Sequence, residues 1–505
     1  MSSSLIAGYH LDEEAFNLLT TISRTEDPVK LIEAALNTLA RLREAPHFIS
    51  RSLLEEVAKE LFSPVEDDEP RPDTSTDSSI TGKASPFHSH AKDVERDITI
   101  LADPTDKICS TGSVDEYLEH FQDRFKRLKG LLRQRMDSRT AGSIRDAFKA
   151  QPRSKPKVVC MVTAKRESKH GIFLEIEDLE THARALVPGN AATQLLEKTK
   201  MLLPDQVVCI GLVKGKGNLL IVEELFFPDI PQHMPRKAKE AVSVALISDL
   251  HVGSKEFMKE AFNRFALWLK GKYGNVRQKD VACNVKYVII AGDVVDGVGI
   301  YPNQLRELAV RDVFKQYKLA GELIREIPEH IEVIIIPGNH DATRKALPQP
   351  AIPKDYIEPL SDARPATSLG NPSTVRIHGV EFLIYHGRSL DDVLSTAANM
   401  SFHSPERAMR LLLKGRHLAP SYGQRTLIAP EKRDFLVIER IPDVFHVGHV
   451  HVMKSEFYRG TLMVNSGAWQ SQTSYQRTAG IEPTPGIIPV VDLQTLAVWP
   501  MDFTA

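Results

Sequence analysis

The sequence predicts a multidomain chain whose last and largest domain is an α/β domain, preceded by a small β-barrel and a helical N-terminal domain. Three observations predict this order. A stretch rich in Ser, Thr, Pro and acidic residues at 63–95 separates the N-terminus from the rest. Short alternating strands fill residues 151–235, and apolar strands alternate with helices from 236 to 505. A chain of 505 residues has room for about two to four domains.

Composition and charge narrow the class of protein. Hydrophobic residues make up 42% and charged residues 26%, which is ordinary for a globular protein. The balance of 64 Lys and Arg against 66 Asp and Glu argues against a uniformly basic coat, though not against a local basic patch. Four cysteines without CxxC spacing favour a reducing compartment. With neither a signal peptide nor an apolar run of membrane-spanning length in view, we expect a cytoplasmic protein.

Residues 1–62 are expected to be helical. Apolar residues from Leu31 to Leu42 recur at helical spacing, and a second amphipathic stretch follows at 50–62. No chemically active cluster accompanies them, so we expect a packing or docking module. The next stretch, 63–95, cannot bury a core with its composition and is predicted to be a disordered linker.

Residues 96–150 are predicted to form a helical connector. Its main helix spans 113–136, because Ser113 and Glu116 form a capping box and apolar residues hold one face. The outer face becomes basic toward the C-terminal end. Those cations either contact nucleic acid or stabilise the helix dipole, and the sequence leaves both interpretations open.

Residues 151–235 are predicted to form a β-barrel of the OB-fold type. Three strands, a helix and two further strands follow one another, which is the element order of that fold. OB-folds often bind single strands by stacking bases on aromatic side chains. Few aromatic residues lie in these strands (Phe173, Phe226 and Phe227), so we expect a structural role beside the next domain.

In the C-terminal domain, 236–505, five apolar strands each end in polar side chains that can bind a metal. In chain order these are Asp249 and His251; Asp293 and Asp296; Asn339, His340 and Asp341; His386; and His446, His449 and His451. Helices are predicted at 256–271 and about 304–327. Ligands bind outside the carboxyl ends of strands in open α/β sheets, so these side chains are expected to converge. Carboxylate, imidazole and amide donors suit Mn, Fe, Co or Zn, and they are too many for one ion.

An isolated histidine on an apolar strand is usually packed in the core. Four histidines fit that description: His330, His378, His403 and His417. For the polar residues at the strand ends, packing in the core would have to be the explanation at five strands at once. This argues against core packing for that set. Two residues of the set stay open. His446 would share a strand face with Gly448 and is expected to be structural or to support a ligand. Asp341 is expected to orient His340 rather than to bind metal.

The motifs at the strand ends carry a resemblance to a known family. DLH, GDVVD, GNHD, YHG and GHVH, in this order, resemble the five motifs of the calcineurin-like metallophosphoesterases. Each motif is short, but all five in order are specific. The wider segments GDVVDGVGIYPNQ, IIIPGNHDATRKALPQP, VIERIPDVFHVGHVH and MVNSGAWQSQTSYQ are similar to the small subunits of archaeal family D DNA polymerases. The predicted domain order matches that family, and the resemblance covers roughly residues 95–500.

The resemblance implies an α/β metallophosphoesterase fold, a two-sheet β-sandwich flanked by helices, with two divalent metal ions. The first ion would be held by Asp249, His251, Asp293 and His451. The second ion would share Asp293 and add Asn339, His386 and His449. Manganese is the ion that we expect, with Fe, Zn, Co or Mg as alternatives.

The resemblance also implies catalytic roles. His340 would not bind metal, because the matching histidine of the related double-strand-break repair nuclease protonates the leaving group or positions the phosphate. Asp293 would be catalytic through the two ions that it bridges. Apart from the resemblance, three further residues are expected to support the side chains of the site without binding an ion: Asp296, Asp341 and His446.

We therefore predict the small subunit of a two-subunit DNA-directed DNA polymerase, acting as a metal-dependent 3′-5′ exonuclease that proofreads DNA ends during replication. The expected partners are the large catalytic subunit and single-stranded 3′ ends of DNA, with no membrane. Two alternatives stay open: a stand-alone metallophosphatase or phosphodiesterase, and a catalytically silent scaffold subunit. The intact ligand set argues against the scaffold, and a stand-alone enzyme leaves the domains in front of the site poorly explained.

Basic and aromatic residues near the motifs are candidates for DNA contacts. The basic candidates are Arg344, Arg388, Arg407 and Arg410. A solvated helical face or a protein interface explains such residues about equally well. Four aromatic residues could stack a frayed terminal base or pack in the core: Tyr301, Tyr422, Trp469 and Tyr475.

Overall fold

A computed structural model describes nearly all of the chain from residue 87 onward and short pieces before it. The described residues are 5–6, 9–11, 48–49, 54, 87–398 and 400–504. The chain divides into two compact units, residues 1–84 and residues 85–505. No helix among the described residues is long and apolar enough to cross a membrane.

In the first unit the described strands form a small sheet. Strands β1 (Leu5–Ile6) and β2 (Tyr9–Leu11) pair antiparallel, and β3 (Phe48–Ile49) pairs parallel with β2. The helices predicted within residues 1–62 lie outside the described residues, apart from the single residue Leu54. Most of the predicted linker lies outside them as well.

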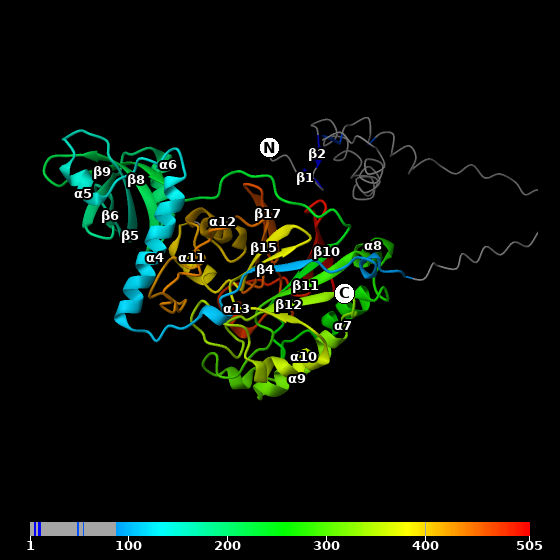
Figure 1. The fold of residues 1–505 in the computed structure, drawn as a ribbon. Coiled ribbons are helices and arrows are strands. Elements are labelled where there is room, and N and C mark those ends of the chain that lie inside the picture. Colours follow the sequence, from blue (N-terminus) through cyan, green and yellow to red (C-terminus); the bar gives the residue numbers. More distant parts are fainter. Residues whose placement is uncertain are drawn as a thin grey trace, which may run out of the picture. The chain divides into compact units, whose positions relative to one another are not determined.

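The second unit contains two six-stranded sheets among its described residues (Figure 1). The first sheet has the order β13-β12-β11-β10-β19-β20. Its strands are β10 (Ser243–Ile247), β11 (Val285–Ala291), β12 (Glu332–Ile336), β13 (Thr367–Ser368), β19 (Ile487–Asp492) and β20 (Val498–Asp502). Strands β10 to β13 are parallel neighbours, and β19 joins β10 antiparallel. The carboxyl ends of the parallel strands therefore share one edge of the sheet.

The second sheet has the order β17-β18-β16-β15-β14-β4. Its strands are β4 (Ile98–Ala102), β14 (Ser373–Ile377), β15 (Val380–Tyr385), β16 (Val444–Val447), β17 (Lys454–Tyr458) and β18 (Thr461–Asn465). Strands β15, β16 and β18 are parallel neighbours. Strand β4 lies within residues 96–150, the predicted helical connector, and is an element that the prediction did not include. It pairs antiparallel with β14 at the edge of the sheet, where a short, partly exposed strand gives little signal in the sequence.

The two sheets pack face to face, as a sandwich. Alternate residues of β11 show the arrangement, because Ile289 packs in the core between the sheets whereas Ile290 packs against helices on the outer face. In the second sheet Phe382 faces the first sheet and Leu383 faces outward. Both faces of these strands are thus covered, which explains why the strands are apolar throughout.

Helices cover the outer faces of the sandwich (Figure 1). They are α7 (Lys259–Leu269), α8 (Val276–Cys283), α9 (Val313–Arg325), α10 (Lys354–Ala363), α11 (Leu390–Thr396) and α12 (Pro405–Gly415). A further short helix is α13 (Ser474–Thr478). The helix predicted at about 304–327 is shorter than expected. A 3₁₀ turn, η3 (Gln304–Arg306), comes first, and α9 begins after Asp312, whose side chain accepts a hydrogen bond from the Lys315 amide.

Residues 157–226 form a closed five-stranded barrel in the order β5-β6-β7-β9-β8. Its elements are β5 (Lys157–Ser168), β6 (Gly171–Glu177), β7 (His182–Pro188), α6 (Thr193–Lys200), β8 (Gln206–Lys214) and β9 (Leu220–Phe226). The structure confirms the predicted small barrel and its element order of three strands, a helix and two strands. That it is an OB-fold stays a prediction.

Helix α4 (Val114–Arg133) is attached to the α/β domain by a buried ion pair. The predicted capping box of Ser113 and Glu116 is present at its start. Further along, Arg124 Nε donates to Asp434 at 2.7 Å, and His417 Nε2 lies 2.8 Å from the same carboxylate. All three side chains are buried. The pair therefore depends on mutual charge compensation away from water. Helix α5 (Ile144–Lys149) follows before the barrel.

Candidate metal centre

The strand ends of both sheets meet at one cavity of about 660 Å³. Strands β10, β11 and β12 of the first sheet and β15 and β16 of the second run into it, because the predicted polar residues follow these strands directly. The residues of the five strand-end motifs that line it are His251, Asp293, Asp296, Asn339, His340, His449 and His451. The convergence expected from the sequence is thus realised across two sheets rather than along one.

Five of the predicted metal ligands have an unusual backbone conformation. Asp249, His251, Asp293, His449 and His451 all have φ between 50° and 70°, in the left-handed region. Residues other than glycine enter this region at a cost of about 1–3 kcal/mol. Such strain clusters at functional sites, because only a specific turn can direct the side chain where it is needed.

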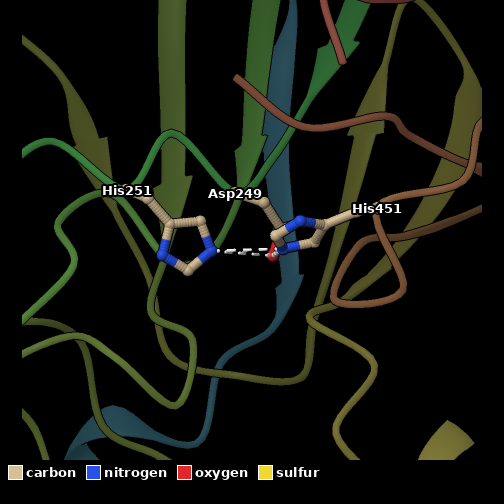
Figure 2. A group of neighbouring side chains, drawn as sticks. All are labelled: Asp249, His251 and His451. Carbon is tan, nitrogen blue, oxygen red and sulfur yellow. Dashed lines mark hydrogen bonds and ion pairs between the residues drawn. The ribbon is translucent and has the colours of Figure 1, made fainter. Parts of the chain in front are cut away.

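The first group of side chains joins β10 to the loop after β16. Asp249 Oδ1 lies 3.3 Å from His451 Nε2 and 3.8 Å from His251 Nε2. The two imidazole nitrogens are 3.2 Å apart (Figure 2). Asp249 Oδ1 is buried and makes no hydrogen bond to any described residue. A buried carboxylate oxygen without a hydrogen bond, facing two nitrogens, is an arrangement that a cation would satisfy.

The second group lies beside the first. His386 Nε2 is 3.3 Å from Asp293 Oδ2 and 3.0 Å from Asn339 Oδ1. The rings of His386 and His449 are 5.2 Å apart between centroids, and donor atoms of Asp293, His386 and His449 lie within 4.8 Å of one another. Asp293 Oδ2 is also 3.8 Å from Nε2 of His251 in the first group. One carboxylate therefore stands between the two groups.

His340 is held by the main chain of Asp296. The Nδ1 atom of His340 lies 2.8 Å from the Asp296 carbonyl oxygen, so this nitrogen carries the proton and Nε2 is left toward the cavity. The Asp296 carboxylate lies 2.9 Å from Nδ1 of His251. Asp296 thus fixes one predicted ligand with its side chain and the predicted catalytic histidine with its backbone. Burial lowers the pKa of His340 to about 4.

Asp341 does not orient His340, contrary to the prediction. Its carboxylate accepts hydrogen bonds from the Gly338 amide at 2.8 Å and from the Tyr317 hydroxyl at 2.9 Å. The tight turn after β12 points Asp341 into the protein while His340 points into the cavity. Asp341 therefore shapes the turn. Burial, helped by the charge of Asp293, raises its pKa to about 6.

His446 is connected to the first group through two serines. Its Nε2 atom lies 3.1 Å from Ser466 Oγ, which lies 2.7 Å from Ser248 Oγ, and Ser248 donates to the Asp249 carboxylate. Burial lowers the pKa of His446 to about 3, so it is neutral at ordinary pH. This agrees with the expectation that His446 supports a ligand and does not bind an ion itself.

The charges of the site compensate each other. Burial would raise the pKa of Asp293, but the imidazoles of His386 and His340 lower it below its ordinary value. Burial would likewise lower the pKa of His386, but Asp293 raises it to about 9. In the protein alone, protons on imidazoles thus balance buried carboxylates. A cation that took their place would release those protons.

Three glycines of the motifs pack directly against these side chains. A Cβ atom on Gly338 would lie 2.2 Å from Asp293 Oδ1, and one on Gly448 would lie 2.6 Å from Asp249 Oδ2. A Cβ atom on Gly292 would lie 2.6 Å from His386 Nδ1. The glycines therefore leave room for the ligand side chains.

The sequence analysis missed several residues that contact the predicted ligands or the supporting Asp296. Asp391 Oδ1 lies 3.2 Å from His449 Nε2, and Gln476 Nε2 lies 2.9 Å from His451 Nδ1. Gln304 donates to the Asp296 carbonyl at 2.8 Å. Asp391 follows the YHG motif closely, and proximity to a motif is the only sequence signal that any of the three offers.

The predicted basic DNA contacts are mostly elsewhere. Arg388 lines the cavity, together with Arg425, which the sequence analysis did not single out as a site residue. Arg344 instead pairs with the buried Glu431 at 2.8 Å. Arg410, on α12, pairs with Glu456, and Arg407 is exposed on the same helix. Of the four predicted arginines, the structure brings only Arg388 to the site.

Of the four aromatic candidates, two pack away from the cavity and two line it. Trp469 is fully buried against Phe262 and Phe265, and Tyr422 packs against α4. Tyr301 and Tyr475 both line the cavity. The cavity thus has arginines, the exposed ring of Tyr475 and the half-buried ring of Tyr301 among its lining residues.

Comparison with known proteins finds sequence relatives among subunits of DNA polymerases. The family of the B subunits of DNA polymerases alpha and epsilon matches residues 244–454. The DNA polymerase II small subunit of Archaeoglobus fulgidus is 35% identical over 96% of this chain and 94% of its own length. That of Halobacterium salinarum is 36% identical over 97% and 96%. That of Pyrococcus furiosus is 40% identical over 76% of this chain, which spans 63% of the relative's length.

Among solved structures, an archaeal phosphodiesterase aligns with 52% of this chain and 99% of its own, with 14% identity and a TM-score of 0.25. Similarity at that level carries no argument about activity. The sequence relatives and the geometry of the cavity are therefore the observations that bear on function.

Proposed function

The chain belongs to the family of DNA polymerase II small subunits, and we propose that it is the exonuclease-bearing subunit of a two-subunit DNA polymerase, trimming 3′ ends during replication. One observation carries this proposal. A full set of oxygen and nitrogen donors from both sheets converges on one cavity, with Asp293 between its two halves. A subunit that served only as a scaffold would have no need of this strained arrangement.

The donor set fits two divalent ions. Asp249, His251 and His451 would hold the first, with Asp293 shared. Asn339, His386 and His449 would complete the second. Four imidazoles favour Mn, Fe, Co or Zn over Mg, which prefers oxygen ligands, and we expect Mn. Such a pair of ions, when bound, neutralises a phosphodiester and activates water for in-line attack.

His340 is the residue that we assign to the leaving group. Its ring is fixed through Nδ1, so Nε2 can meet the 3′ oxygen as the bond breaks. Burial keeps the imidazole neutral in the free protein, with a pKa of about 4. A phosphodiester beside the ring would add negative charge and favour the protonated form. We therefore assign protonation of His340 to the substrate complex.

The cavity walls support a single-stranded DNA end as substrate. Arg388 and Arg425 would attract the phosphate backbone, and Tyr301 and Tyr475 would stack a terminal base. We also assign the five-stranded barrel to the OB-fold class, from its strand order and the position of α6. Polymerase chemistry would be supplied by the large catalytic subunit.

A substrate comparison tests this proposal. The purified chain is incubated with Mn²⁺ and either 5′-labelled single-stranded DNA or p-nitrophenyl phosphate esters. We expect stepwise shortening of the DNA with release of 5′-mononucleotides, and much slower turnover of the esters. Ester hydrolysis without DNA shortening would instead indicate a stand-alone phosphatase or phosphodiesterase. A chain that binds no metal and leaves both substrates intact would indicate a scaffold.

A further inference from the structure

The first turn of α11 places a carboxylate beside His449. Asp391 Oδ1 lies 3.2 Å from His449 Nε2, with only 14% of the Asp391 side chain and 11% of the His449 side chain exposed. The loop between β15 and α11 approaches His449 closely, because a Cβ atom on Gly387 would lie 3.2 Å from the His449 Cβ atom. The contact therefore joins two segments that are held together by the fold.

Asp391 stands outside the second group of predicted ligands. Donor atoms of Asp293, His386 and His449 lie within 4.8 Å of one another, and Asp391 does not belong to that set. Its second oxygen is engaged by Arg388, whose Nη1 lies 3.0 Å from Asp391 Oδ2.

A histidine that binds a metal through one ring nitrogen carries its proton on the other. An oxygen acceptor at that second nitrogen fixes both the tautomer and the direction of the ring. Two other predicted ligands have such an acceptor. Nδ1 of His251 faces the Asp296 carboxylate at 2.9 Å, and Nδ1 of His386 faces the Ala291 carbonyl at 2.8 Å.

We propose that Asp391 is a positioning residue for the second metal ion, accepting a hydrogen bond from Nε2 of His449 and leaving Nδ1 of His449 to bind the ion. This rests on the proposed two-metal function. In His251 and His386 the outer nitrogen is Nδ1, whereas in His449 it is Nε2. His449 would thus present the opposite nitrogen to the site, and only an acceptor placed where Asp391 lies can fix that tautomer.

Metal titration of the full chain tests the proposal. Mn²⁺ is added to metal-free protein, bound ions are counted by mass spectrometry, and the coupled two-ion signal is followed by electron paramagnetic resonance. For Asp391→Asn we expect the first ion to bind as in the parent and the second about 10–100-fold more weakly. Asp391→Glu, which keeps the charge, should recover part of that loss. Glu197→Gln, an exposed change on α6, should leave both ions unaffected.

The rate of DNA trimming provides a second test of the proposed role of Asp391. Excess Mn²⁺ should restore DNA trimming by Asp391→Asn, because occupancy is what the variant loses, and a merely structural defect would not be rescued in this way. Should Asp391→Asn lose its cooperative thermal transition, Arg388→Ala is measured instead, since it frees the other Asp391 oxygen and should also weaken the second ion.

The outcomes separate this inference from the proposed function. If the parent binds two ions and Asp391→Asn binds both equally tightly, Asp391 does not position His449, while the two-metal site stands. If the parent binds no pair of ions, the proposed function itself is wrong.

Discussion

Asp293 Oδ2 lies 3.3 Å from Nε2 of His386, and this contact ties the first sheet to the second beside the cavity that Asp293 lines. The same oxygen is 3.8 Å from Nε2 of His251 in the other group. We predict that Asp293→Asn loses affinity for both ions, because it removes the charge that the two groups share. Bound metal, measured by mass spectrometry, should fall below two ions per chain, and DNA trimming should fall more than the roughly 10–100-fold expected for an outer-shell contact.

A different result would change the assignment. If Asp293→Asn kept two ions of unaltered affinity, Asp293 would not bridge them. Glu197→Gln removes a charge from an exposed position on α6 and serves as the control, with unchanged metal content.

Gly338→Ala tests whether the motif glycines make room for ligands. Its Cβ atom would lie 2.2 Å from Asp293 Oδ1, so the carboxylate or the turn must move. We expect at least about a tenfold loss of Mn²⁺ affinity, similar to the loss of an outer-shell contact. Gly130→Ala on α4 is the matched control, because its Cβ atom would meet nothing within 4 Å. That variant should keep metal affinity and gain about 0.5–1 kcal/mol in free energy of unfolding.

Arg425→Ala tests the cationic wall of the cavity. Arg425 lines the cavity, and its side chain makes no hydrogen bond or ion pair to any described residue, so it is available to a phosphate. We expect KM for single-stranded DNA to rise about tenfold, equivalent to about 1.4 kcal/mol, with kcat nearly unchanged. The dependence of binding on salt should weaken by about 0.7 in the logarithmic slope. Arg407→Ala, on α12 outside the cavity, should change neither quantity.

Asp434→Asn tests the attachment of α4. The change leaves Arg124 buried without its counter-charge, and we expect the free energy of unfolding at pH 7 to fall by about 3–5 kcal/mol. Burial would raise the pKa of Asp434, but His417 and Arg124 hold it well below its usual value. The carboxylate therefore stabilises the fold above the unfolded-state pKa of about 3.9, and this stabilisation is lost as the pH falls further toward the folded-state pKa.

Urea unfolding at several pH values measures this effect. The difference between the parent and Asp434→Asn should be largest at neutral pH and should shrink below about pH 4. Asp362→Asn, at an exposed position of α10, should change the free energy of unfolding by less than about 0.5 kcal/mol. An equal difference at pH 3 and pH 7 would show that the charge of Asp434 is not what stabilises the fold.

The convergence of the predicted metal ligands could be predicted because each strand end carries its own local signal. After β12, Pro337 and Gly338 end an apolar run, and Asn339 and His340 follow at once. Parallel strands of a buried sheet end at a common edge, so local signals at several strands add up to one site. The fold class followed from the same apolar runs, which are buried on both faces.

The supporting contacts were not predictable in this way, because they join residues far apart in the chain. Nothing in the spacing of Asp391 or Gln476 indicates that they meet His449 and His451. Adjacency in the sequence also led to a wrong prediction. Asp341 is adjacent to His340, yet the turn directs their side chains to opposite sides. Strand β4 pairs with a distant edge strand, which local pattern cannot reveal.

The measurement that tests the central claim most directly is trimming of 5′-labelled single-stranded DNA by the parent chain and by His340→Ala, each shown beforehand to hold two Mn²⁺ ions. We predict stepwise loss of 5′-mononucleotides from the 3′ end by the parent and a loss of about 10²–10⁴-fold in turnover for His340→Ala, with metal content and thermal transition kept. DNA left intact by the metal-loaded parent, or trimmed equally fast by His340→Ala, would contradict the account.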